Sequence, residues 1–115
     1  MAVRIEFQRE LQDLHEQIIR MGAAVEQAIG LAVEALINLD TELAQQVIDG
    51  DDVIDEMERS IDRKCVRLIA LQQPVARDLR DVTANLKLIT DLERIGDEAE
   101  RVGRMVQPLE QLEEQ

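Results

Sequence analysis

The sequence predicts an all-α protein, an up-down-up bundle of three long helices. Two observations support this fold class. Apolar residues recur every three or four positions through most of the 115 residues, which is the period of one helix face. Patterns typical of strands, with alternating apolar and polar residues, are nearly absent. We expect one domain over 1–107 and an acidic tail over 108–115, with Pro108 ending the helical order.

The first helix is expected to run from near Phe7 to Leu39. Its apolar positions are spaced alternately by fours and threes, as in helices that pack at a shallow angle. They are Phe7, Leu11, Leu14, Ile18, Met21, Val25, Ala28, Ala32, Ala35 and Leu39. Asp40 follows at once and is suited to cap the next helix, so we expect the first two helices to be antiparallel neighbours.

The second and third helices are expected on either side of Pro74, which suits the first position of a helix. The apolar residues of the second are Leu43, Val47, Ile54, Met57, Ile61, Leu68 and Leu71. Those of the third are Val75, Leu79, Val82, Leu86 and Ile89, and then Leu92, Ile95, Ala99, Val102 and Val106.

Gly50 leaves two interpretations open for the second helix. Asp49-Gly50-Asp51-Asp52 has the composition of a turn between two shorter helices. However, Val47, Ile54, Ile61 and Leu68 keep a spacing of seven across the glycine, and a loop would normally reset that phase. We therefore favour a continuous helix, in which Gly50 costs about 1 kcal/mol relative to Ala.

Acidic residues form matching patterns on the second and third helices. The stretch VIDGDDVIDEMERSID (47–62) holds seven acids, and its spacing does not fit an EF-hand loop. On a continuous helix, Asp51, Asp55, Glu58 and Asp62 would share one stripe, as would Glu93, Asp97 and Glu100 on the third helix.

The hairpin geometry predicts that the two acidic stripes meet. If Leu71 faces Val75 across the turn, Asp51 lies level with Ile95, and Gly50 faces Gly96, allowing the helices to approach closely. Clustered carboxylates need protonation or a counter-cation. A metal site is therefore one interpretation of the cluster, and an all-oxygen ligand set would favour Mg, Ca, Mn or Fe. The alternative is a solvated acidic surface whose salt-bridge partners are Arg59, Arg63, Arg94 and Arg101.

Composition excludes several other functions. The net charge of −12 and the presence of a single aromatic residue argue against nucleic-acid binding. No segment is apolar enough for a signal peptide or a membrane span. The only histidine, His15, lies outside both acidic motifs, and Cys65 is expected to be a buried hydrophobe. We therefore expect no enzyme, and a reducing compartment suits the lone cysteine.

Two segments, LIALQQPVARDLR (68–80) and DLERIGDEAERV (91–102), resemble the signature segments of the PhoU family of bacterial phosphate-uptake regulators. The likeness extends through VEQAI, ALINLD and GDDVIDEMERSI. It implies a cytoplasmic regulator of phosphate uptake and phosphate-starvation signalling that contacts the ATPase of a phosphate ABC transporter and a phosphate-sensing histidine kinase. It also implies an iron or zinc cluster held by Asp51 with Asp55 and by Glu93 with Asp97, to which Glu58 and Glu100 are weaker additions.

The chain departs from this family in length, because typical members carry two three-helix repeats and this chain has one. The alternative functions are a metal-free helical adaptor and the cytoplasmic domain of a sodium–phosphate cotransporter. Apolar residues beyond the seam of the first helix predict a homodimer that would cover them. They are Ile19, Ile29, Leu31, Val33 and Leu36.

Overall fold

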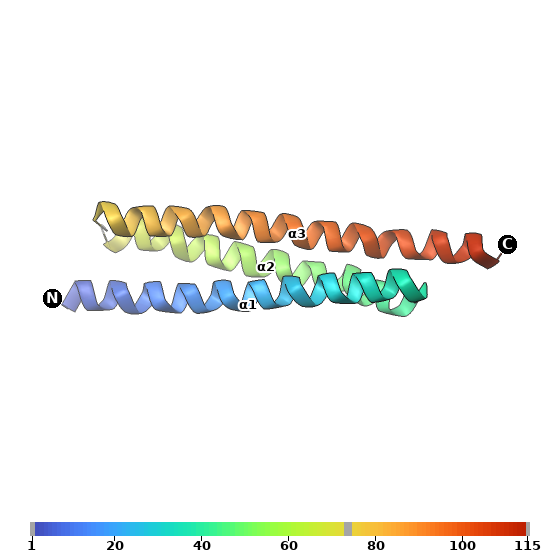
Figure 1. The fold of residues 1–115 in the computed structure, drawn as a ribbon. Coiled ribbons are helices and arrows are strands. Elements are labelled where there is room, and N and C mark those ends of the chain that lie inside the picture. Colours follow the sequence, from blue (N-terminus) through green and yellow to red (C-terminus); the bar gives the residue numbers. More distant parts are fainter. Residues whose placement is uncertain (1, 73–74, 115) are drawn as a thin grey trace.

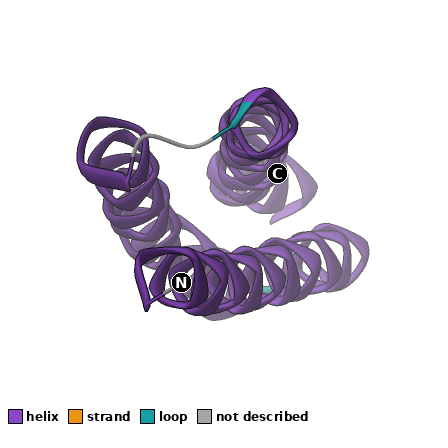
Figure 2. Ribbon diagram, turned by 90° about the vertical axis from the view of Figure 1, so that its left-hand side faces the viewer, coloured by secondary structure: helices purple, strands orange, loops and turns teal. Residues whose placement is uncertain are grey.

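The computed structural model describes residues 2–72 and 75–114, with the side chains of 5–70 and 75–114. It contains the helices α1 (Ala2–Asn38), α2 (Thr41–Gln72) and α3 (Ala76–Glu114). They run up, down and up along a rod of 68 × 17 × 16 Å, with the two termini at opposite ends (Figure 1). Viewed from its end, the rod shows the helices at the corners of a triangle (Figure 2). The predicted all-α, up-down-up bundle is confirmed.

The connection between α1 and α2 is built from two consecutive residues. Leu39 adopts a left-handed conformation, with φ of 49°, and its N–H donates to the Leu36 carbonyl oxygen. The N–H of Asp40 donates to the Ala35 carbonyl at 2.9 Å, which completes a Schellman ending of α1. The Asp40 carboxylate then accepts the N–H of Leu43 at 3.1 Å. The predicted cap of the second helix is therefore present, and it reverses the chain within two residues.

The predicted seams of α1 and α2 form the core. In the first seam, every residue from Phe7 to Val25 is buried, as are Ala32 and Ala35. In α2, Val47, Ile54, Ile61 and Leu68 are buried, and the helix is continuous through Gly50. Cys65 is fully buried as well, which confirms its interpretation as a small hydrophobe.

The seam predicted for α3 is partly wrong. Val75, Leu79 and Ile95 are exposed by 58%, 40% and 43%, whereas Asp78 and Asn85 are buried. The buried residues of α3 are Asp78, Val82, Asn85, Ile89, Gly96, Ala99, Gly103 and Val106. They keep the spacing of fours and threes except for one step of seven from Ile89 to Gly96, but several are polar or lack a side chain. In these places the large apolar residues of α3 lie beside its buried face, so the apolar pattern does not identify the buried positions.

Two further predictions concern the prolines. The expectation that Pro108 ends the helical order is wrong, because α3 continues through it to Glu114. Proline removes one donor and crowds the preceding turn, which bends or weakens a helix without always ending it. The prediction that Pro74 occupies the first position of the third helix lies outside the described residues. The division into a domain over 1–107 and a tail over 108–115 stays a prediction.

The close approach of α2 and α3 depends on different glycines from those predicted. A methyl group added at Gly50 would meet nothing within 4 Å, so Gly50 does not face Gly96. A methyl group on Gly96 would lie 3.3 Å from Ile54 Cγ2, and one on Gly103 would lie 3.2 Å from the Ala44 carbonyl oxygen. Gly96 and Gly103 therefore set the spacing of the two helices.

Candidate metal centre

The two acidic stripes meet in the groove between α2 and α3. Ile54 contacts the Gly96 position and Ala44 the Gly103 position, which is within one helical turn of the predicted register. Because Gly96 has no side chain, the Asp51 carboxylate fits beside it, with Oδ1 3.6 Å from where a Cβ would lie. Backbone geometry thus brings carboxylates from both helices together.

Three of the six predicted ligands form the centre of the cluster. Asp51, Asp55 and Asp97 each offer a carboxylate oxygen, and these three oxygens lie within 4.8 Å of one another. Asp51 is only 5% exposed, and the other two are half-buried. Such a separation is suited to a cation held between oxygens at 2.0–2.6 Å from each.

Two buried carboxylate oxygens in the cluster lack hydrogen-bond partners, namely Oδ1 of Asp51 and Oδ1 of Asp55. Buried polar atoms are normally paired, since leaving one unpaired costs about 1–3 kcal/mol. Among the described residues, no basic side chain lies within ion-pair distance of Asp51, Asp55 or Asp97. These unpaired carboxylate oxygens are therefore available to bind a metal ion.

The remaining predicted ligands surround this centre. Hydrogen bonding with neighbouring acids shifts the pKa values of this group, between Glu93 and both Asp97 and Asp55, and between Asp51 and Glu100. Glu58 is half-buried, and the negative charges of Asp55 and Asp97 help to raise its pKa. The structure thus places all six predicted residues in one groove, with Glu58 at its edge.

The raised pKa values of the cluster show that holding several buried carboxylates close together is unfavourable when they are charged. Burial, followed by the hydrogen bond to Glu100 and the neighbouring acids, raises the pKa of Asp51 to about 8. The hydrogen bond to Asp97, then burial and nearby charges, raises the pKa of Glu93 to about 7. Burial is also the main cause that raises the pKa values of Asp55 and Glu58. Protonation or a bound cation would relieve the same repulsion.

Glu100 behaves in the opposite way because it accepts hydrogen bonds. The bonds from Asp51 and from Arg104 lower its pKa, and Arg104 Nε lies 2.6 Å from Glu100 Oε1. Arg104 was missed as a neighbour of the cluster, although its i+4 spacing from Glu100 could have indicated it.

Three of the four arginines named for the solvated alternative pair elsewhere, and no ion pair of Arg94 is seen among the described residues. Arg59 and Arg63 contact Glu56, at 3.2 and 3.3 Å, and Arg101 contacts Glu98.

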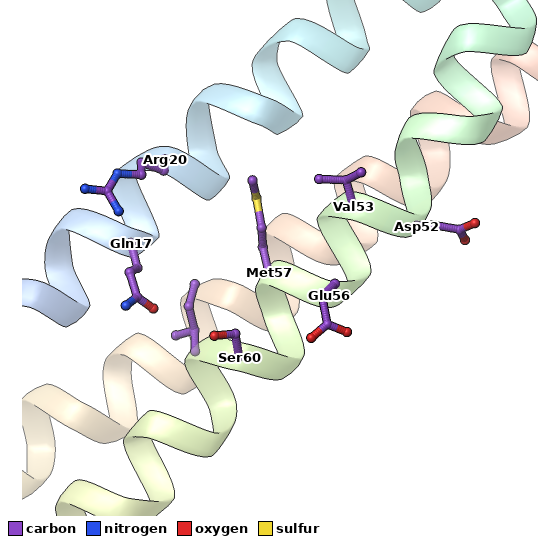
Figure 3. Close-up of a pocket in the computed structure, with 8 residues that line it drawn as sticks. Gln17, Arg20, Asp52, Val53, Glu56, Met57 and Ser60 are labelled. Carbon is purple, nitrogen blue, oxygen red and sulfur yellow. The ribbon is translucent and has the colours of Figure 1, made fainter.

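A separate cleft lies between α1 and α2 and contains none of the six predicted ligands. It has a volume of about 550 Å³ and combines apolar walls with a polar rim (Figure 3). Its lining residues are Gln17, Arg20, Asp52, Val53, Glu56, Met57, Ser60 and Ile61.

Comparison with known proteins gives the family. The model of the PhoU domain matches residues 18–106, which is most of the chain. The chain belongs to the PhoU family. The predicted resemblance is thereby confirmed.

PhoU relatives match at about half of the aligned positions. The phosphate-specific transport system accessory protein PhoU homolog of Aquifex aeolicus is 50% identical over 94 residues, which are 82% of this chain and 42% of the relative. The homolog of Pseudomonas aeruginosa is 50% identical over 99 residues, covering 86% of this chain and 41% of the relative. The PhoU protein of Escherichia coli is 46% identical over the same shares.

A solved PhoU structure has the same fold. The crystal structure of PhoU from Pseudomonas aeruginosa superposes with a TM-score of 0.85 and 49% sequence identity. The match covers 87% of this chain and 48% of that chain. The chain therefore spans less than half the length of these relatives. Among the described residues, no helix combines the length and apolar content that a membrane crossing requires.

Proposed function

We propose that this chain is an accessory protein of phosphate uptake and phosphate-starvation signalling, acting through protein contacts and a carboxylate-bound metal. Two observations support the proposal. The relatives are named as accessory proteins of a phosphate-specific transport system. The groove between α2 and α3 gathers six acids, two of which have buried oxygens without partners.

Asp51, Asp55 and Asp97 are proposed as the central ligands, with Glu93, Glu58 and Glu100 completing the coordination. Iron or zinc follows from the family resemblance, while the all-oxygen ligand set also suits Mg, Mn or Ca. A bound cation would compensate the clustered charge and link α2 to α3. This would fix the surface that the groove presents to a partner.

The proposed partners are the ATPase of a phosphate ABC transporter and a phosphate-sensing histidine kinase, in the cytoplasm. We also propose that the chain forms a homodimer, and that it binds no nucleic acid, in keeping with its charge of −12.

We propose regulation without catalytic turnover. The sole thiol, Cys65, is buried, and burial followed by the charge of Asp62 raises its pKa to about 11, so it is a poor nucleophile. The sole histidine, His15, lies on α1 and contacts Asp81 at 3.6 Å, on the far side of α3 from the acids. Hydrolysis of ATP or a phosphoester by pure protein, abolished by Asp97→Asn, would contradict this proposal.

Metal binding is tested on protein purified without a histidine tag, by elemental analysis and by thermal unfolding. We expect the melting temperature to rise with added Mn, Fe or Zn and to fall with a chelator, because a ligand that binds only the folded state stabilises it. Asp97→Asn should reduce the rise. Asp62→Asn is the matched control, since Asp62 shares the α2 stripe but is exposed and lies outside the central triad.

If melting responds to neither metals nor chelators, or if both variants respond equally, the acidic groove is merely solvated. The chain would then be a metal-free adaptor. The regulatory role is tested separately, in a bacterium that lacks its own family member and carries a phosphate-starvation reporter. We expect the chain to lower reporter output when phosphate is abundant, and an unchanged output would count against the role.

A further inference from the structure

The outer sides of α1 and α3 lie side by side and carry a second set of apolar residues. On α1, these positions each follow a core residue, as Ile19 follows Ile18. On α3, nearly all of them precede a residue of the core stripe, as Leu88 precedes Ile89. His15 and Asp81 occupy the same flanks and approach to 3.6 Å, so the two flanks are neighbours.

We call this surface the α1/α3 face. It is defined by positions 19, 22, 26, 29, 33 and 36 of α1 and positions 88, 91, 95, 98, 102, 105 and 109 of α3. Large apolar side chains at eight of these positions are exposed, by 37% at Leu36 and Leu109 up to 71% at Ile19. The eight are Ile19, Ile29, Val33, Leu36, Leu88, Ile95, Met105 and Leu109.

The other sides of the bundle carry fewer exposed large apolar residues. Among the described residues of α2, only Val53 and Val66 are exposed large hydrophobics. The groove between α2 and α3 holds the acidic cluster, and one end of the α1–α2 groove is bridged by the Lys64–Asp13 and Arg67–Glu10 pairs. Eight of the fifteen exposed large hydrophobics among the described residues therefore lie on the α1/α3 face, and a patch of this kind is where a soluble protein usually meets a partner.

The α1/α3 face also carries little net charge. Its acids on α3 are paired one turn away, Asp91 with Lys87 at 3.5 Å and Glu98 with Arg101 at 2.7 Å. Glu26 is its one acid for which the described residues supply no ion pair. The repulsion expected between two chains of net charge −12 is therefore small at this face.

The spacing of the apolar positions indicates what covers them. They alternate by threes and fours along both helices, which is the pattern of contact with other helices running at a shallow angle to the bundle axis. At 1.5 Å per residue, the two stripes are about 26 and 32 Å long, and two adjacent helices are about 20 Å wide. The face thus measures on the order of 600 Å², close to the roughly 800 Å² that each partner contributes to a standard interface.

We propose that two copies of the chain pair through their α1/α3 faces about a two-fold axis, since such an axis lets one patch serve both partners. This inference rests on the self-association proposed above and names its surface. It leaves the groove between α2 and α3 open in each copy. Each chain therefore keeps its own complete set of acidic ligands, and the pair presents two separate metal sites.

The test measures mass by light scattering across micromolar concentrations for the 115-residue chain and two variants. Ile95→Glu places a charge in the middle of the face, and Val66→Glu makes the same change at a more exposed apolar residue of α2. We expect the unchanged chain and Val66→Glu to have twice the mass of 13.1 kDa, and Ile95→Glu to have 13.1 kDa. Circular dichroism checks that both variants keep their helices.

A mass of 13.1 kDa for the unchanged chain throughout would overturn the proposal and would assign the face to another partner, such as further sequence in a longer protein. Equal behaviour of the two variants would overturn it as well. Metal-induced stabilisation is measured on Ile95→Glu in parallel. If a monomeric variant still responds to metal, pairing and metal binding are separate properties, and either can fail without the other.

Discussion

Replacing Asp51 by Asn tests whether the acidic groove is under electrostatic strain without metal. Asp51 is 5% exposed, its Oδ1 has no partner, and Asp55, Asp97 and Glu100 surround it. Asparagine keeps the shape of the side chain and removes the charge. We therefore expect the substitution to stabilise the metal-free protein at neutral pH and to weaken its response to metal.

The pH dependence follows from the pKa of Asp51, which is raised from 3.8 to about 8. Between these values the folded state holds a proton that the unfolded state has lost, so stability falls as pH rises. At pH 7 the solution lies about three pH units above the ordinary pKa of 3.8, and each unit corresponds to roughly 1.4 kcal/mol. The charge of Asp51 therefore lowers the unfolding free energy by at most about 4 kcal/mol. Because the proton is shared with Glu100, we expect Asp51→Asn to raise the unfolding free energy by about 1–4 kcal/mol at pH 7.

Urea unfolding followed by circular dichroism, with a chelator present, measures this difference at several pH values. The advantage of Asp51→Asn should be near zero below about pH 4 and should grow toward about pH 8. Asp52→Asn is the control, because Asp52 is exposed and its loss should change stability by less than about 0.5 kcal/mol. The reasoning is wrong if Asp51→Asn destabilises the metal-free protein at pH 7, or if its effect is the same at pH 4 and pH 8.

Four other predictions concern stability and reactivity. Gly50→Ala should raise the unfolding free energy by about 0.5–1 kcal/mol, because the added methyl meets nothing and a helical glycine is costly. Gly103→Leu should lower it by about 1–3 kcal/mol through its contact with the Ala44 backbone, and similar urea midpoints for the two variants would contradict the assigned spacing of α2 and α3. The Cys65 thiol should react with a thiol reagent only as fast as the protein unfolds, so rapid labelling of native protein would argue against its burial. Asp40→Ala should cost about 0.5–2 kcal/mol in urea unfolding and Asp40→Asn much less, because asparagine can still accept the Leu43 N–H.

The periodicity of the sequence was sufficient to predict the three helices, their order and most of the core. The spacing of sevens from Val47 to Leu68 also predicted a continuous helix through Gly50, as observed. The carboxylates of the groove could be named because residues three and four apart share a helix face whatever packs against it. These features depend on hydrogen bonds and side-chain spacing within one helix, so a short stretch of sequence contains the information.

Packing between helices determined which positions of α3 are buried, which carboxylates meet and which apolar residues form one face. Asp78 and Asn85 occupy buried positions of α3 that an apolar pattern cannot indicate, and Gly96, not Gly50, makes room for the Asp51 carboxylate. Which carboxylates meet, and which oxygens lack partners, depends on register between residues some 40 positions apart. The sequence likewise indicated apolar residues outside the first seam, but only the placement of α3 beside α1 joined Ile29 and Ile95 into one face. Such contacts depend on how the surfaces of two helices pack together, and the sequence of one helix does not determine that packing.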